Sequence, residues 1–134
     1  MLGAATVRAE LMVGPRAQGR IDAAWIDQLI AAFELAPLLD RVPQRLSSGQ
    51  SRRVALAAIA AARPAVLLLD EPTSGLDWPG KIQLRRMLEH FRQAGMALVI
   101  ASHDRDWAAQ LPARHVVLEA GRCRAARPEA VDGI

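Results

Sequence analysis

The sequence predicts an α/β fold built on a parallel sheet. Two continuous apolar runs, residues 66–69 and 96–101, have the length and composition of strands that are covered on both faces. Helical patterns of apolar residues lie before, between and after these runs. Strands that alternate with helices favour parallel pairing, with the helices on the faces of the sheet.

The first part of the chain is expected to be mostly helical after a loop-rich start. Residues 1–20 have weak periodicity and several glycines, which predicts loops with at most one short helix. Asp22 is a suitable cap for the next helix, whose apolar residues recur at helical spacing. That stripe consists of Ile26, Leu29, Ile30 and Phe33. Pro37 ends or restarts this helix, and Pro43 closes the following turn.

The second part of the chain contains the predicted sheet. Serines at residues 47–48 start an alanine-rich helix that stops at Arg63-Pro64, directly before the first strand. A turn-rich loop over residues 72–80 leads to a helix that Gly95 terminates. After the second strand we expect a short helix around Trp107, a third strand at residues 116–118, a turn at Gly121 and a loose tail from Ala125.

Length, charge and cysteine content exclude several protein classes. The chain has 134 residues, a net charge of +3 and one cysteine, so we expect a single domain without an internal disulfide, in a reducing cytoplasm. Its apolar runs are far shorter than the roughly 20 residues of a membrane helix, and its start does not resemble a signal peptide. Scattered arginines and few aromatics indicate a solvated surface, and no nucleic-acid partner is expected.

Acidic and polar residues follow both predicted strands. Asp70 and Glu71 come directly after the first strand, and Ser102 and His103 come directly after the second. Chemistry in such sheets lies beyond the carboxyl ends of the strands. Neighbouring residues of an extended chain point to opposite faces, so one carboxylate could hold Mg²⁺ while the other orients water, as phosphoryl transfer requires. Alternatively, the acidic pair only begins a turn and His103 only caps a helix.

A further anion-binding signal precedes the first strand. Ser47, Ser48, Gly49 and Gln50 open a helix, and such a helix start offers hydroxyls, backbone N–H groups and a partial positive charge of about +0.5. The segment is also an ordinary capping sequence. Because it begins the helix that leads into the strand before Asp70, the anion-binding interpretation is favoured.

The order of these motifs resembles the second half of an ABC-type ATPase domain, which has the P-loop NTPase fold. The motifs are LSSGQ (46–50), VLLLDEP (66–72), SGLD (74–77) and SHD (102–104), and the start of the chain is similar to ATPases of energy-coupling-factor importers. The resemblance implies roles for each motif. LSSGQ is the signature motif that contacts nucleotide in trans, Asp70 holds the metal, Glu71 is the general base, Asp77 belongs to the D-loop and His103 is the switch histidine.

The resemblance also implies an organisation, cofactors and partners. Residues 1–63 correspond to a partial helical signature subdomain, and residues 64–134 to the C-terminal part of the ATPase core. The cofactors are ATP and Mg²⁺. The partners are transporter membrane subunits and either a second ATPase subunit, identical or different, or a separate N-terminal half. The expected location is the cytoplasmic face of the membrane.

Two departures within the motifs are mild: Ser48 replaces the usual glycine, and Trp78 replaces a proline. The serious departure is that the family's phosphate-binding loop, G-x-x-x-x-G-K-S/T, is not found before the signature. The run from Gly75 to Lys81 imitates it, but Ile82 supplies no hydroxyl and Pro79 removes a backbone donor. We therefore expect the chain alone to be inactive and to associate with a polypeptide that completes its sheet.

Three functions remain open at this stage. The first is an ATP-hydrolysing subunit of an ABC-type membrane transporter, truncated or split. The second is a non-catalytic partner that offers its signature motif to an intact ATPase, although the presence of Glu71 and His103 argues against it. The third is a fragment of a non-transport ABC ATPase. No heptad run of the kind carried by DNA-repair members is present.

Overall fold

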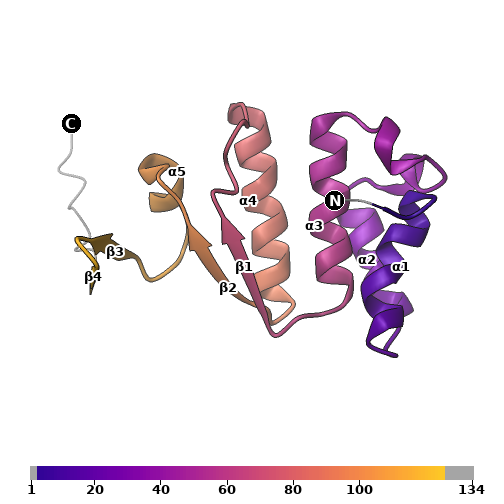
Figure 1. The fold of residues 1–134 in the computed structure, drawn as a ribbon, viewed down its shortest axis with the longest axis horizontal. Helices are drawn as coiled ribbons and strands as arrows, with labels where there is room; N and C mark the ends of the chain where they lie inside the picture. The colour runs from indigo at the N-terminus through magenta and orange to yellow at the C-terminus, as the bar shows by residue number, and fades with distance from the viewer. Residues whose placement is uncertain (1–2, 126–134) are drawn as a thin grey trace. The chain divides into compact units, whose positions relative to one another are not determined.

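The structure, a computed structural model, describes residues 3–125. The predicted helices and strands occur in the predicted order, and one further strand, at residues 122–125, was not expected. The chain divides into two compact units, one ending at Asp104 and the other beginning at Arg105. The first contains α1 (Val7–Ala17), α2 (Ala23–Ala32), α3 (Ser48–Ala61), β1 (Val66–Asp70), α4 (Trp78–Gln93) and β2 (Ala97–Ala101) (Figure 1). The second contains α5 (Arg105–Ala109), β3 (Val116–Glu119) and β4 (Arg122–Ala125).

Polar caps begin the helices of the first unit where the sequence predicts them. The Asp22 carboxylate accepts the N–H of Trp25, which starts α2. Ser47 and Gln50 form a reciprocal capping box at the start of α3. Gly95 follows α4 with φ +93°, a conformation that favours glycine and ends the helix. Short 3₁₀ helices at Ala36–Leu38 and Pro43–Arg45 contain the two prolines that were expected to punctuate this region.

The expectation of a loop-rich start is wrong in extent, because α1 runs through both Gly14 and Pro15. Close packing explains the glycine: a Cβ at Gly14 would lie 3.0 Å from the Cβ of Ala62, just beyond the end of α3. Pro15 lies near the end of the helix and is buried. The helix therefore depends on contact with α3, which weak local periodicity does not reveal.

A column of rings joins α2 to α4. The Trp25 ring stacks on His90 with centroids 5.6 Å apart, and Phe33 meets His90 edge-on at 5.5 Å. Phe33 also meets Phe91 edge-on at 5.4 Å, and the Arg63 guanidinium lies over the Trp25 ring, 5.0 Å from its centroid. The indole N–H of Trp25 donates to the carbonyl of Ala60 in α3. These contacts bind three helices together.

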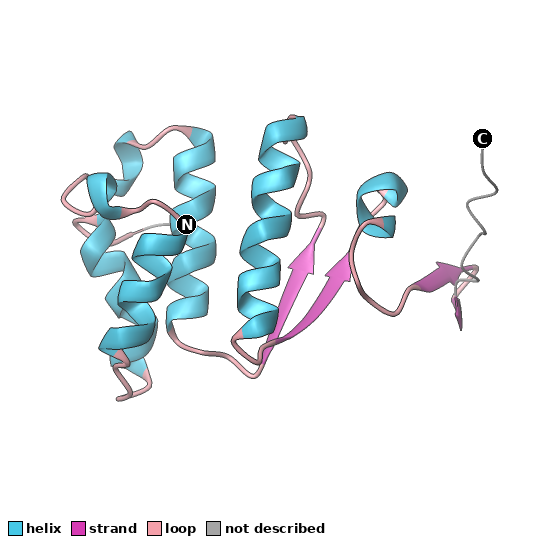
Figure 2. Cartoon of the chain, turned by 180° about the vertical axis from the view of Figure 1, so that it is seen from behind, coloured by secondary structure: helices cyan, strands magenta, loops and turns pink. Residues whose placement is uncertain are grey.

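The sheet of the first unit has two parallel strands, with Val66 opposite Ala97 and Asp70 opposite Ala101 (Figure 2). One face packs against α4 and includes the buried Leu67. Within residues 3–125 the other face is uncovered although the runs have the composition of strands covered on both faces, as expected for a sheet that another polypeptide would complete, and alternate residues on it are open to solvent. These are Val66, Leu68 and Val99, which are 51%, 72% and 57% exposed.

The third predicted strand exists but does not belong to the parallel sheet. β3 pairs antiparallel with β4 in a sheet of their own. Ala120 and Gly121 both have positive φ, 49° and 73°, which is the geometry of a tight hairpin turn. Gly121 is thus a turn residue as predicted, whereas Ala125 ends a strand and the rest of the predicted loose tail lies outside the described residues.

The predicted subdomain boundary between residues 63 and 64 falls inside the first unit. It stays a prediction about the organisation of a larger domain.

Candidate functional site

Asp70 and Glu71 mark the carboxyl end of β1. Asp70 is the last residue of the strand, and its carboxylate is exposed. The N–H of Glu71 donates to the carbonyl of Ala101 at 2.8 Å, which continues the pairing with β2. Glu71 then turns the chain with φ +47°. The expectation of extended backbone here is wrong, and this left-handed turn, rather than strand alternation, sets the direction of the Glu71 side chain.

Glu71 and His103 are brought together by the pairing of β1 with β2. The backbone N–H of His103 donates to both carboxylate oxygens of Glu71, at 3.0 Å to Oε1 and 3.3 Å to Oε2. The imidazole Nε2 of His103 lies 3.5 Å from the same Oε1. The His103 side chain is 99% exposed and that of Glu71 is 37% exposed, so both remain open to an incoming ligand.

Asp77 caps α4. Its Oδ1 accepts the N–H of Gly80 at 2.9 Å. This bond occupies one of the backbone donors that the sequence GLDWPGK would need for a phosphate loop. Lys81, the last residue of that sequence, forms an ion pair with Asp104 at 2.5 Å. Residues 75–81 therefore lead into a helix and do not form a phosphate-binding loop.

The predicted signature segment lies at the exposed start of α3. The Ser47 hydroxyl accepts the N–H of Gln50 at 3.2 Å, and the Gln50 side-chain oxygen accepts the N–H of Ser47 at 3.1 Å. Ser48 and Gly49 are exposed, and a Cβ at Gly49 would meet nothing within 4 Å. Within residues 3–125 the segment forms no hydrogen bond with Asp70, Glu71 or His103, so the two sites are separate.

Arg52 was missed by the sequence analysis. Its guanidinium donates from Nη1 to the carbonyl of Pro72 at 2.6 Å and from Nη2 to that of Ser74 at 2.9 Å. It therefore connects α3 to the loop between Glu71 and Asp77. The sequence alone does not predict these contacts, because an arginine one turn into a helix is usually a solvated residue.

The part of the chain that the structure describes contains no cluster of three or more His, Cys, Asp or Glu side chains that could hold a metal ion. Asp70 forms no side-chain hydrogen bond with residues 3–125, so its carboxylate is available. Mg²⁺ is commonly held by one or two carboxylates, substrate phosphates and water rather than by a complete protein cage. The donor set fits that mode of binding.

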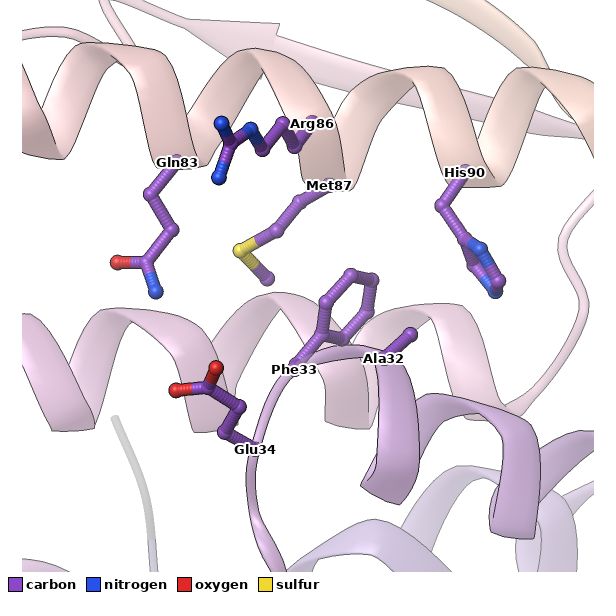
Figure 3. A pocket seen from close by; sticks show the side chains of 7 residues that line it. All are labelled: Ala32, Phe33, Glu34, Gln83, Arg86, Met87 and His90. Carbon is purple, nitrogen blue, oxygen red and sulfur yellow. The ribbon is translucent and has the colours of Figure 1, made fainter.

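A pocket of about 180 Å³ lies between α4 and the segment that follows α2 (Figure 3). It is lined by Ala32, Phe33, Glu34, Gln83, Arg86, Met87 and His90. None of the predicted site residues lines it. The Nε2 atom of His90 is buried without a hydrogen-bond partner within residues 3–125. This pocket is therefore distinct from the group of residues at the strand ends.

Comparison with known sequences decides the family. The sequence model of the ABC transporter family matches residues 3–74, which is more than half of the chain. The chain belongs to the ABC transporter family. The matched residues of this ABC transporter family member include the predicted signature segment, Asp70 and Glu71.

Named relatives in the ABC transporter family are ATP-binding proteins of importers and energy-coupling systems. The cobalt import ATP-binding protein CbiO of Rhodobacter capsulatus is 45% identical over 124 residues, covering 90% of this chain and 44% of that protein. The energy-coupling factor transporter ATP-binding protein EcfA2 of Latilactobacillus sakei is 39% identical over 122 residues, covering 87% and 42%. The chain thus spans less than half the length of these relatives.

Solved structures of ABC transporter proteins have the same fold. The cbiO1 protein of Clostridium perfringens, described as part of the transporter complex cbiONQ, superposes with a TM-score of 0.70 at 31% identity over 81% of this chain and 45% of that one. A putative metal-chelate type ABC transporter in an inward-facing conformation gives 0.77 at 20% identity over 94% and 53%, which shows the fold alone. The structure is thus a fragment of the P-loop NTPase fold. Among residues 3–125 no helix is long and apolar enough to cross a membrane.

Proposed function

We propose that this chain supplies the water-activating and partner-facing part of the ATP-binding, ATP-hydrolysing subunit of an ABC-type importer. The observation that carries the proposal is the contact between Glu71 and His103, with the backbone N–H of His103 3.0 Å from the Glu71 carboxylate, next to the exposed Asp70. The relatives named as cobalt-import and energy-coupling ATP-binding proteins support the importer class.

The proposed roles follow from the chemistry of each group. Asp70 holds Mg²⁺ together with the phosphates of ATP; when bound, this ion neutralises charge on the phosphate oxygens. Glu71 accepts a hydrogen bond from the attacking water and takes its proton at a carboxylate oxygen. His103 donates from its exposed imidazole toward the terminal phosphate and, through its backbone N–H, keeps the Glu71 carboxylate in place.

The signature segment serves a nucleotide that a partner holds. The exposed Ser48 and Gly49 stand at the N-terminus of a helix, where backbone donors and the helix dipole favour an anion. The partner supplies the phosphate-binding loop, either as a second ATPase subunit or as a separate N-terminal half. Membrane subunits complete the transporter, with this chain at the cytoplasmic face of the membrane.

Complementation of ATP turnover tests this function. The chain alone, in magnesium buffer, is expected to show no turnover above its Glu71→Gln variant. The N-terminal part of a relative, which holds the phosphate-binding loop and ends before the region that this chain matches, should gain turnover when it is produced together with this chain. Turnover should be lost with Gly49→Asp, which obstructs the signature, and with Glu71→Gln, which removes the base.

The two variants also separate the competing functions. Loss with Gly49→Asp but not with Glu71→Gln would show a non-catalytic partner subunit. No turnover with the unmodified chain, under conditions where the two proteins co-purify, would contradict the proposed function altogether.

A further inference from the structure

The position of His103 is not fixed by packing of its own side chain, which is 99% exposed. It depends instead on how the backbone around it is held. The N–H of His103 donates to the Glu71 carboxylate, and the next N–H, that of Asp104, donates to the Ser102 hydroxyl at 3.0 Å. Neither contact connects this segment to a helix of the first unit.

Lys81 provides that connection. Its ammonium lies 2.5 Å from Oδ2 of Asp104, and the two side chains are 26% and 21% exposed. Among the ion pairs of residues 3–125, it is the one in which both side chains are less than a third exposed; the others have at least one partner open to water. Solvent screens this pair less than a surface pair, and removing one partner leaves the other charge partly buried.

The pair joins two segments that both belong to the site. Lys81 lies in the first turn of α4, immediately after the helix start that Asp77 caps. Asp104 directly follows His103 in the sequence. Lys81 is the only lysine of the chain, and in the sequence it stands out as the end of a false phosphate-loop motif. In the structure, the Lys81 ammonium instead pairs with the Asp104 carboxylate.

We infer that Lys81 and Asp104 are a positioning pair that holds the His103 backbone N–H on the Glu71 carboxylate. Lys81 fixes Asp104 relative to α4, and the peptide between Asp104 and His103 transmits that restraint to the His103 N–H. The catalytic meaning of this arrangement rests on the proposed function, whereas the geometric statement concerns this chain alone.

Nuclear magnetic resonance of the full chain tests the geometry. In the unmodified chain the His103 amide proton should be protected from exchange with solvent by its hydrogen bond to the Glu71 carboxylate, and Glu71→Ala should abolish that protection. Lys81→Met and Asp104→Asn should each reduce the protection to the Glu71→Ala level. The charge-swapped double variant Lys81→Asp with Asp104→Lys should restore it. Glu89→Gln, which removes the exposed pair with Arg92, is the matched control and should change nothing.

The amide resonances of the β1–β2 sheet distinguish global unfolding from loss of the His103 contact. Amides in the β1–β2 ladder, such as those of Leu67 and Leu98, should keep their resonances in every variant. A His103 amide that stays fully protected in both Lys81→Met and Asp104→Asn would overturn the inference. If one single variant fails to fold, the other and the charge swap still decide.

Turnover provides a second readout in the complemented ATPase described above. Lys81→Met should lower kcat about tenfold or more with KM for ATP nearly unchanged, because misplacing a catalytic group slows the step after binding. An equal change in both parameters would indicate a structural effect and count against a positioning role. Failure of complementation itself would bear on the proposed function, and the amide result would still stand.

Discussion

The backbone N–H of His103 lies 3.0 Å from Oε1 and 3.3 Å from Oε2 of Glu71, although 32 positions separate the two residues in the sequence. Their proximity results from the parallel register of β1 and β2, in which Asp70 stands opposite Ala101. The Glu71 carboxylate therefore already receives a donor from the neighbouring strand end before any ligand is bound. A carboxylate held in this way is restricted in its rotation, which favours a defined position for a water molecule beside it.

Replacement of His103 should separate the imidazole from the backbone contact. In the complemented ATPase, His103→Ala keeps the backbone N–H but removes the ring, and we expect turnover to fall by about 10²–10⁴-fold, the range for a positioned acid–base group. Glu71→Gln should fall at least as far. Steady-state turnover with saturating ATP measures both. A His103→Ala enzyme within a factor of about two of the unmodified one would contradict a role for the imidazole in the chemical step.

The open face of the β1–β2 sheet should make the isolated chain associate. Leu68 and Val99 are 72% and 57% exposed on the same face, and contiguous apolar surface of this kind favours association or aggregation. Leu68→Lys should shift sedimentation toward the monomer. Val13→Lys, at a 55% exposed residue of α1, is the control and should have no such effect. Monodisperse behaviour of the unmodified chain would count against this prediction.

Gly14 should tolerate no larger side chain while Ala62 is present. Gly14→Val should destabilise the protein by about 1–3 kcal/mol, the usual cost of inserting extra atoms into a packed contact, since even a Cβ would lie 3.0 Å from that of Ala62. Thermal or denaturant unfolding measures the change. Ala62→Gly should recover part of the loss in the double variant, whereas additive effects of the two substitutions would show that the contact is not the cause.

The Asp22 cap should make stability depend on pH. The N–H of Trp25, followed by the Arg63 guanidinium, holds the pKa of Asp22 below its ordinary value of 3.8. Because the folded pKa is the lower one, the stabilisation is complete above pH 3.8 and is lost as the pH falls through the folded value. Asn is an equally good cap without a charge, so Asp22→Asn should remove this dependence. Melting temperatures of both proteins across the acid range test it, and parallel curves would contradict it.

The sequence was sufficient for features that local chemistry determines. Caps at Asp22 and Ser47, the apolar runs of β1 and β2 and the polar residues at their carboxyl ends all follow from residue type and order. Pairing of the two strands then brings Glu71 and His103 together, as expected from the general position of sites in parallel sheets.

Features that depend on distant contacts were not predictable in this way. α1 contains Gly14 and Pro15, which locally oppose a helix, and its packing against α3 outweighs that preference. The left-handed turn at Glu71 and the antiparallel pairing of β3 depend on backbone conformations that residue type alone does not impose. The partner of Lys81 lies 23 residues away, so the sequence offered only a false motif.

The two hydrogen bonds donated by the Arg52 guanidinium have a structural consequence. A rigid guanidinium that grips two carbonyls, those of Pro72 and Ser74, couples the start of α3 to the peptide that leaves Glu71. The start of α3 and the loop that follows Glu71 are therefore joined through one side chain, and a displacement of either would be opposed by both hydrogen bonds of Arg52.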